Sequence, residues 1–154
     1  MKKILVITDS HSHFDKILKM VEKENPDIVI SAGDYSRDAE ELSYLFKEKE
    51  FFIVNGNGDF FDRTHEDEIL IEIEGKKFFI THGHFYGVKS SYDSLRKKSL
   101  DLECDITIFG HTHRTYLEKK EGHPILYNPG AAMDGKYGIV MLHDNDVEIN
   151  TMQF

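Results

Sequence analysis

The chain has 154 residues, with 28 acidic and 19 basic side chains, a formal net charge of −9, nine histidines and one cysteine. This length supports one domain, residues 1–154, with an ordinary hydrophobic core. Cys104 alone forms neither an internal disulfide nor a thiolate metal cage, so we expect a cytoplasmic protein whose metals would bind nitrogen and oxygen. The acidic balance argues against binding of extended nucleic acid, and the short apolar runs argue against a membrane partner.

The first third of the chain alternates apolar runs with helical patterns. Strands are expected at Lys3–Thr8, Asp27–Ser31 and Phe51–Val54, and apolar residues recur at helical spacing around Ile17 and Leu42. Ser12 and Asp15 resemble a capping box that would start the first helix, and Asn25 before Pro26 would end it. The order strand, helix, strand, helix, strand implies a parallel sheet.

The later part of the chain is richer in short strands. Ile69–Glu74 and Lys77–Thr81 flank Gly75 as a hairpin, and Leu95 lies in a short polar helix. Further strands are expected at Asp105–Phe109, Thr115–Lys119, Ile125–Tyr127, Tyr137–His143 and Val147–Met152. We therefore expect an α/β fold of two mixed sheets packed face to face, with helices outside.

Five of the expected strands run directly into residues that bind metals or form turns. These exits are Asp9-Ser10-His11, Ala32-Gly33-Asp34, Asn55-Gly56-Asn57-Gly58-Asp59, His82-Gly83-His84 and Gly110-His111-Thr112-His113. Taken singly, the first three are typical of capping loops and turns, and each histidine pair is an even choice between a ligand pair and a structural one. Ligands in open α/β sheets bind at the carboxyl ends of strands, so the five exits together favour one shared metal site.

These motifs, in this order, resemble those of the calcineurin-like metallophosphoesterases. The resemblance spans Asp9 to His113, and Tyr127-Asn128-Pro129-Gly130-Ala131 resembles a loop of the family's small bacterial and archaeal phosphodiesterases. It implies a four-layer α-β-β-α sandwich and a centre of two divalent transition-metal ions. Manganese is the first expectation for these ions, with iron, zinc or nickel as alternatives.

The resemblance also implies a ligand set. Asp9, His11 and His113 would hold the first metal, Asn57, His82 and His111 the second, and the carboxylate of Asp34 would bridge both. A shared carboxylate offsets part of the repulsion between two dications about 3.5–4 Å apart. The nucleophile would be a hydroxide that bridges the two ions, attacking a small phosphodiester.

Two residues are expected to act on the substrate as well. Asn57 can bind metal through its amide oxygen while its NH₂ group donates to a phosphate oxygen. His84 is the candidate to contact phosphate or to protonate the leaving oxygen, and a supporting role outside the ligand shell is the alternative.

The sequence departs from the family at Gly58, where many members carry a histidine that acts as an acid. Without that partner Asp59 is expected to be structural, and aryl phosphodiesters, whose leaving groups need little protonation, are the better test substrates. His65 is expected to be a solvated loop residue, with a reach back to the site as the alternative.

Other side chains leave alternatives open. Arg37, Arg63 and Arg114 either grip phosphate or lie on the surface, and one of Phe60 and Phe61 could floor a substrate pocket. Phosphomonoester hydrolysis is the second enzymatic hypothesis. The non-enzymatic one is a scaffold like the retromer subunit of similar fold, and homo-oligomerisation through the later strands is an expectation from the family alone.

Overall fold

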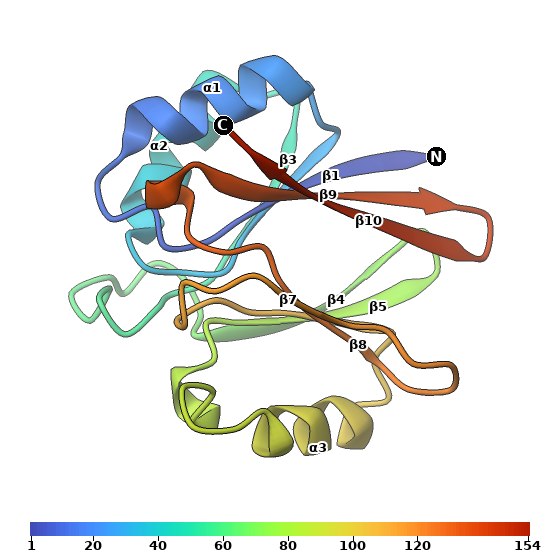
Figure 1. Ribbon diagram of the computed structural model, residues 1–154. Helices are drawn as coiled ribbons and strands as arrows, with labels where there is room; N and C mark the ends of the chain where they lie inside the picture. Colours follow the sequence, from blue (N-terminus) through green and yellow to red (C-terminus); the bar gives the residue numbers. More distant parts are fainter.

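The computed structural model describes residues 1–154 and shows two five-stranded mixed sheets packed face to face (Figure 1). The first sheet has the order β10-β9-β1-β2-β3 and the second the order β4-β5-β6-β8-β7. Helices α1 (Phe14–Glu24) and α2 (Ser36–Leu45) cover the outer face of the first sheet, and α3 (Asp93–Asp101) covers the second (Figure 1). The expected four-layer α-β-β-α architecture is therefore confirmed.

Strand directions follow from the connections between the strands. In the first sheet β1 (Lys2–Ile7), β2 (Ile28–Ser31) and β3 (Glu50–Ile53) are parallel, and β9 (Lys136–His143) and β10 (Asp146–Gln153) add antiparallel pairs. In the second sheet β5 (Lys76–Thr81), β6 (Ile106–Ile108) and β8 (Ile125–Asn128) are parallel, whereas β4 (Glu68–Ile73) and β7 (Tyr116–Glu118) form the antiparallel edges. Parallel neighbours end at the same edge, so their exits meet there.

Three hydrophobic cores hold the four layers together. Side chains alternate across a strand, so in β1 Ile4 and Val6 face the second sheet while Leu5 and Ile7 face the helices. The core between the sheets is the largest, and the third core lies between the second sheet and α3, with Phe79 and Leu95 among its members. Burial on both faces fixes the register of β1, because a slip by one residue would exchange its two sets of side chains.

The start of α1 differs from its prediction. The N-cap is His13, no side chain caps the helix, and Ser12 has a left-handed φ of 67° instead of the capping-box geometry. The Ser12 backbone N–H donates to Asp38 at 3.0 Å, so a tertiary contact replaces the local one. The predicted end is confirmed, since Asn25 is the left-handed C-cap before Pro26.

None of the helices combines the length and the apolar character that a membrane-spanning helix requires.

Candidate metal centre

The loops that leave the strands carry an unusual concentration of left-handed backbone. Five of the predicted metal ligands have positive φ angles between 45° and 71°: Asp9, His11, Asp34, His111 and His113. Such a conformation costs on the order of 1–3 kcal/mol for a residue with a side chain, and such strain clusters at functional sites. The turns bring these side chains back toward the ends of the sheets.

The two carboxylates each have one oxygen held and one oxygen free. Asp9 is fully buried, and its Oδ2 accepts hydrogen bonds from the Thr8 hydroxyl at 2.9 Å and from the His111 backbone N–H at 3.0 Å. Asp34 Oδ1 accepts from the Gly58 backbone N–H at 2.7 Å. The remaining oxygens, Asp9 Oδ1 and Asp34 Oδ2, point toward histidines and face no lysine or arginine within ion-pair distance.

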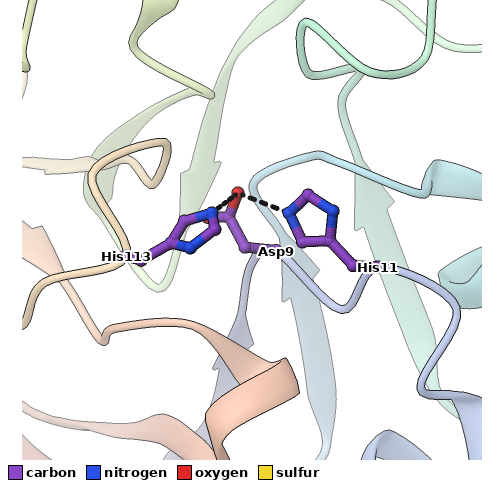
Figure 2. Close-up of side chains that lie close together, drawn as sticks. All are labelled: Asp9, His11 and His113. Atoms are coloured by element: carbon purple, nitrogen blue, oxygen red, sulfur yellow. Dashed lines mark ion pairs between the residues drawn. The ribbon is translucent and has the colours of Figure 1, made fainter.

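Three imidazole nitrogens surround Asp9 Oδ1. It lies 3.5 Å from His11 Nε2, 3.6 Å from His82 Nε2 and 3.2 Å from His113 Nε2. Figure 2 shows the His11 and His113 rings on opposite sides of the Asp9 carboxylate. Asp34 Oδ2 is 3.6 Å from the Nε2 atoms of both His11 and His82, so it lies between the first and second predicted ligand sets.

His82 shows how the protein prepares a donor atom. Its ring is fully buried, and its Nδ1 lies 2.8 Å from the Ala32 carbonyl oxygen. A carbonyl only accepts hydrogen bonds, so Nδ1 carries the proton and Nε2 keeps a free lone pair directed at the two carboxylates. This is the arrangement that orients a histidine ligand for a metal ion.

These donors fit a divalent ion on structural grounds. Asp9 Oδ1, His11 Nε2 and His82 Nε2 are buried without a hydrogen-bond partner, a costly state for polar atoms. Donor atoms about 2.1 Å from a metal are about 3.0–3.4 Å from one another in octahedral or tetrahedral geometry, close to the separations seen here. Two groups place one donor atom from each residue within 4.8 Å of the others, one of Asp9, His11 and His113 and one of Asp9, Asp34 and His82.

The other predicted ligands, Asn57 and His111, contact each other beside this cluster. Asn57 Oδ1 lies 3.0 Å from His111 Nδ1, and the His111 ring centroid is 5.1 Å from that of His82. Burial, the neighbouring His82 and Lys89 lower the pKa of His111 to about 4, which favours the neutral imidazole that a metal requires. The structure thus gathers all seven predicted ligands in one region.

His84 lies on the rim of the same region, in the short 3₁₀ segment His84–Tyr86. Its ring centroid is 5.5 Å from that of His82 and 6.1 Å from that of His111, and its Nδ1 is buried without a hydrogen-bond partner. Burial and the nearby His82 lower the pKa of His84. A neutral His84 can give or receive one hydrogen bond at this rim.

The loop from residue 55 to 66 has a mainly structural role at its base. Asp59 is buried and accepts hydrogen bonds from the backbone N–H groups of Tyr35, Ser36 and Gly56, which agrees with its expected structural role.

His65 is neither solvated nor turned to the site, because its Nδ1 lies 2.7 Å from Asp62 Oδ2. Phe60 and Phe61 are 74% and 87% exposed, so both leave the core.

Two glycines allow the strand exits to pack against the carboxylates. A Cβ on Gly110 would lie 2.0 Å from Thr8 Oγ1 and 2.7 Å from Asp9 Oδ2, and one on Gly56 would lie 2.2 Å from Asp34 Oδ1. All three distances are far below van der Waals contact, so only glycine fits at either position. The sequence showed these glycines as turn residues, but their contact with the carboxylates requires the tertiary structure.

Sequence reasoning missed the residues that hold the ligand-bearing loops in place through hydrogen bonds. Asn128 is fully buried, and its Nδ2 donates to the Gly110 carbonyl and to Thr112 Oγ1, both at 3.1 Å. The loop after Asn128 continues the support, because the Ala132 N–H donates to the Thr8 carbonyl at 2.8 Å. The Asn-Pro-Gly motif indicated this loop without giving it a role, and Thr8 had no signal beyond its place before Asp9.

The sequence of the chain matches a known protein family. Residues 1–146 match the calcineurin-like phosphoesterase superfamily domain, and the chain belongs to that family. It is 31% identical to the phosphodiesterase MJ0936 of Methanocaldococcus jannaschii, over 95% of this chain and 93% of the relative. It is 32% identical to a probable metallophosphoesterase of Mycoplasma pneumoniae, over 85% of this chain and 79% of the relative.

Solved structures show the same fold. A predicted phosphoesterase of Streptococcus pneumoniae has a TM-score of 0.80 at 22% identity and covers 99% of this chain and 89% of its own. An archaeal phosphodiesterase has a TM-score of 0.68 at 26% identity, covering 97% and 99%. Vps29 of Entamoeba histolytica, solved in complex with Zn²⁺, has a TM-score of 0.75 at 18% identity and covers 98% of each chain.

Proposed function

We propose that this chain is a metal-dependent phosphodiesterase that hydrolyses a small phosphodiester at a centre of two divalent ions, with manganese as the first candidate. The observation that carries the proposal is the pair of overlapping donor groups that share Asp9, together with their buried and unpartnered atoms. The phosphodiesterase of Methanocaldococcus jannaschii, 31% identical over nearly the whole chain, supports the choice of reaction.

The residues present divide the work between holding ions and contacting substrate. Asp9, His11 and His113 would hold one ion, Asn57, His82 and His111 the other, and Asp34 would lie between them. When bound, the ions would supply a water of lowered pKa and positive charge opposite the phosphoryl oxygens. The buried carboxylates are oriented for this task, because each is fixed through its second oxygen and leaves the other oxygen free to bind an ion.

Asn57 and His84 are the two side chains proposed to contact the phosphate of the substrate. The Asn57 NH₂ group can donate to a phosphoryl oxygen, and His84 at the rim can donate its single N–H to another. The lowered pKa of His84 leaves the ring mainly unprotonated at neutral pH, so little of the acid form is present to protonate a leaving group, and Gly58 offers no side chain in its place. Diesters with phenolate leaving groups, which need little protonation, are therefore the preferred test substrates.

Two other functions are compatible with the fold. A phosphomonoesterase would use the same donors, and a Vps29-like scaffold would not need turnover at all. Vps29 of Entamoeba histolytica was solved with Zn²⁺, so metal binding alone does not separate a scaffold from an enzyme. Turnover, and the ratio of diester to monoester hydrolysis, separates the three.

The test measures hydrolysis of bis(p-nitrophenyl) phosphate and p-nitrophenyl phosphate by purified protein after chelation and after reloading with Mn²⁺, Fe²⁺, Zn²⁺ or Ni²⁺. We expect diester hydrolysis only with a transition metal, and its loss in His82→Ala. Lys97→Ala, an exposed change on α3, serves as the control and should retain the activity. Equal activity in the chelated protein or in His82→Ala contradicts the proposal, and a faster monoester reaction replaces it with the second candidate.

A further inference from the structure

A cavity of about 350 Å³ beside the metal centre differs in charge from the rest of the molecule. It is lined by Val88, Lys89, Tyr92, Thr112 and Arg114, with two cations and no carboxylate. Each of the four other larger cavities contains at least two acidic residues. In a chain with 28 acidic and 19 basic side chains, a purely cationic cavity is the exception.

Its position ties the cavity to the candidate site. Thr112 stands between the predicted ligands His111 and His113, and Arg114 follows directly. Val88 is buried, and its side chain closes over Gly83, where a Cβ would meet it at 3.1 Å, in the segment between His82 and His84. The cavity thus adjoins the histidines of the second sheet.

Hydrogen bonds hold the backbone segments that line this cavity, whereas the charged side-chain ends of Lys89 and Arg114 have no partner. Thr112 Oγ1 accepts from the Arg114 backbone N–H and from buried Asn128, both at 3.1 Å. The turn that carries Lys89 is closed by the Ser90 N–H donating to the Gly87 carbonyl at 2.9 Å. Lys89 and Arg114 are exposed, and neither forms an ion pair, whereas Arg96 pairs with two carboxylates.

We infer that Lys89 and Arg114 bind a second phosphoryl group of the substrate, so that the substrate is a small phosphodiester with a further phosphate on one of its alcohol portions. The inference rests on the proposed function of the adjoining centre. Cations are the partners that phosphate requires, and guanidinium binds its oxygens in pairs. The other cavity near the centre suits this group less well, because Arg37 and Arg63 share it with Asp38, Glu40, Asp59 and Asp62.

The first measurement compares two substrates with the same scissile bond, the p-nitrophenyl ester of thymidine 5′-phosphate and its 3′-phosphorylated form, with the metal-loaded protein. We expect a lower KM for the 3′-phosphorylated form. Lys89→Ala and Arg114→Ala should each reduce that preference by about five-fold, the upper range for exposed charge pairs, and the double variant should remove it. The control double variant Lys97→Ala/Lys120→Ala makes the same change of charge at exposed sites elsewhere and should keep the preference.

The second measurement does not depend on turnover. Inorganic phosphate is titrated into the metal-free protein, and the amide signals of Lys89, Thr112 and Arg114 are followed by NMR. Shifts in the wild type that disappear in the Lys89→Ala/Arg114→Ala variant support the subsite, even if neither ester is hydrolysed and the proposed function fails. An unchanged preference between the two esters in the double variant, or an absence of specific amide shifts where no turnover occurs, overturns the inference.

Discussion

The two sheets contribute different chemistry to the candidate centre. The first sheet supplies both carboxylates, Asp9 after β1 and Asp34 after β2, together with His11 and Asn57. The second sheet supplies imidazoles alone, His82 after β5 and the pair His111 and His113 after β6. The carboxylate side chains are almost completely buried, at 0% and 6% exposed, while His113 is 38% exposed. Negative charge therefore lies deep in the molecule, and the imidazoles of the second sheet cover it from the opposite side.

The buried carboxylates of the first sheet have no positively charged partner in the structure. A buried carboxylate without a cation is unfavourable, and neither Asp9 nor Asp34 pairs with a lysine or an arginine. A divalent ion between the sheets would supply the missing charge and join the two halves.

Removing one charge from the first sheet should have the largest effect. Asp34→Asn keeps an oxygen for the Gly58 N–H but replaces the oxygen that faces His11 and His82. We expect kcat/KM for bis(p-nitrophenyl) phosphate to fall on the order of 10³-fold, about 4 kcal/mol of transition-state stabilisation.

The same variant should be at least as stable as the wild type without metal, since an uncompensated buried charge is gone. Steady-state kinetics and thermal unfolding measure the two quantities. Asp144→Asn, in the exposed turn between β9 and β10, is the matched control and should change neither. A destabilised metal-free Asp34→Asn protein would contradict the division of charge between the sheets.

Metal should stabilise the protein by joining the sheets. At a free concentration of 100 times its Kd, one ion raises the free energy of unfolding by about 2.7 kcal/mol. Thermal unfolding with increasing Mn²⁺ after chelation measures the shift. The rise in unfolding temperature with Mn²⁺ should be smaller in Asp34→Asn, which removes a donor from the first sheet, and in His82→Ala, which removes one from the second. An undiminished rise in either variant would show that the ion binds elsewhere.

Contact between the sheets can also be disturbed without removing a ligand. In Gly110→Ala the new methyl group would overlap Thr8 Oγ1 and press on Asp9. We expect a loss of about 1–3 kcal/mol of stability, as for other overpacking changes, and weaker metal binding. Gly122→Ala is the control for metal binding. Its Cβ would meet nothing within 4 Å, and its φ of 77° adds only local backbone strain, so its metal affinity should stay at the wild-type value. A Gly110→Ala protein with wild-type metal affinity would show that Asp9 is not held by this contact.

The smallest effect should come from an ion pair that lies within the second half alone. The bidentate hydrogen bonds from Arg96 on α3 lower the pKa of Glu118 on β7 to about 2 from its ordinary 4.5. The folded pKa is below the unfolded one, so this stabilisation is present above pH 4.5 and is lost as the pH falls toward 2. The pair is partly exposed, which limits its contribution to about 1 kcal/mol or less.

Glu118→Gln tests this pair through chemical unfolding between pH 2 and 7. The variant should be slightly less stable at pH 7 and should lose less stability on acidification than the wild type. Metal binding should be unchanged, since the side-chain partners of Glu118 are Arg96 and Tyr116 and not residues of the centre. A changed metal affinity would show that the charge of the second half is coupled to the centre.

Much of the fold was predictable because its signals are local. Apolar runs such as Ile4–Ile7 and turn residues such as Gly75 set the strands and the hairpin, and their neighbours in sequence are sufficient to show it. The capping box at Ser12 failed because Asp38, 26 residues away, binds the Ser12 N–H. Local propensity at a loop is weak, and a tertiary hydrogen bond of this kind readily overrides it.

The types of donor and their places in the chain were predictable from the sequence, because five strand exits in register carry carboxylates, an amide and imidazoles. Only the tertiary structure decided that Asp9 belongs to both donor groups, that Asn128 supports the His111 loop and that Lys89 and Arg114 share a cavity without an acid. The physical reason is distance along the chain. The His111 N–H that holds Asp9 is 102 residues away, and no local pattern encodes such a contact.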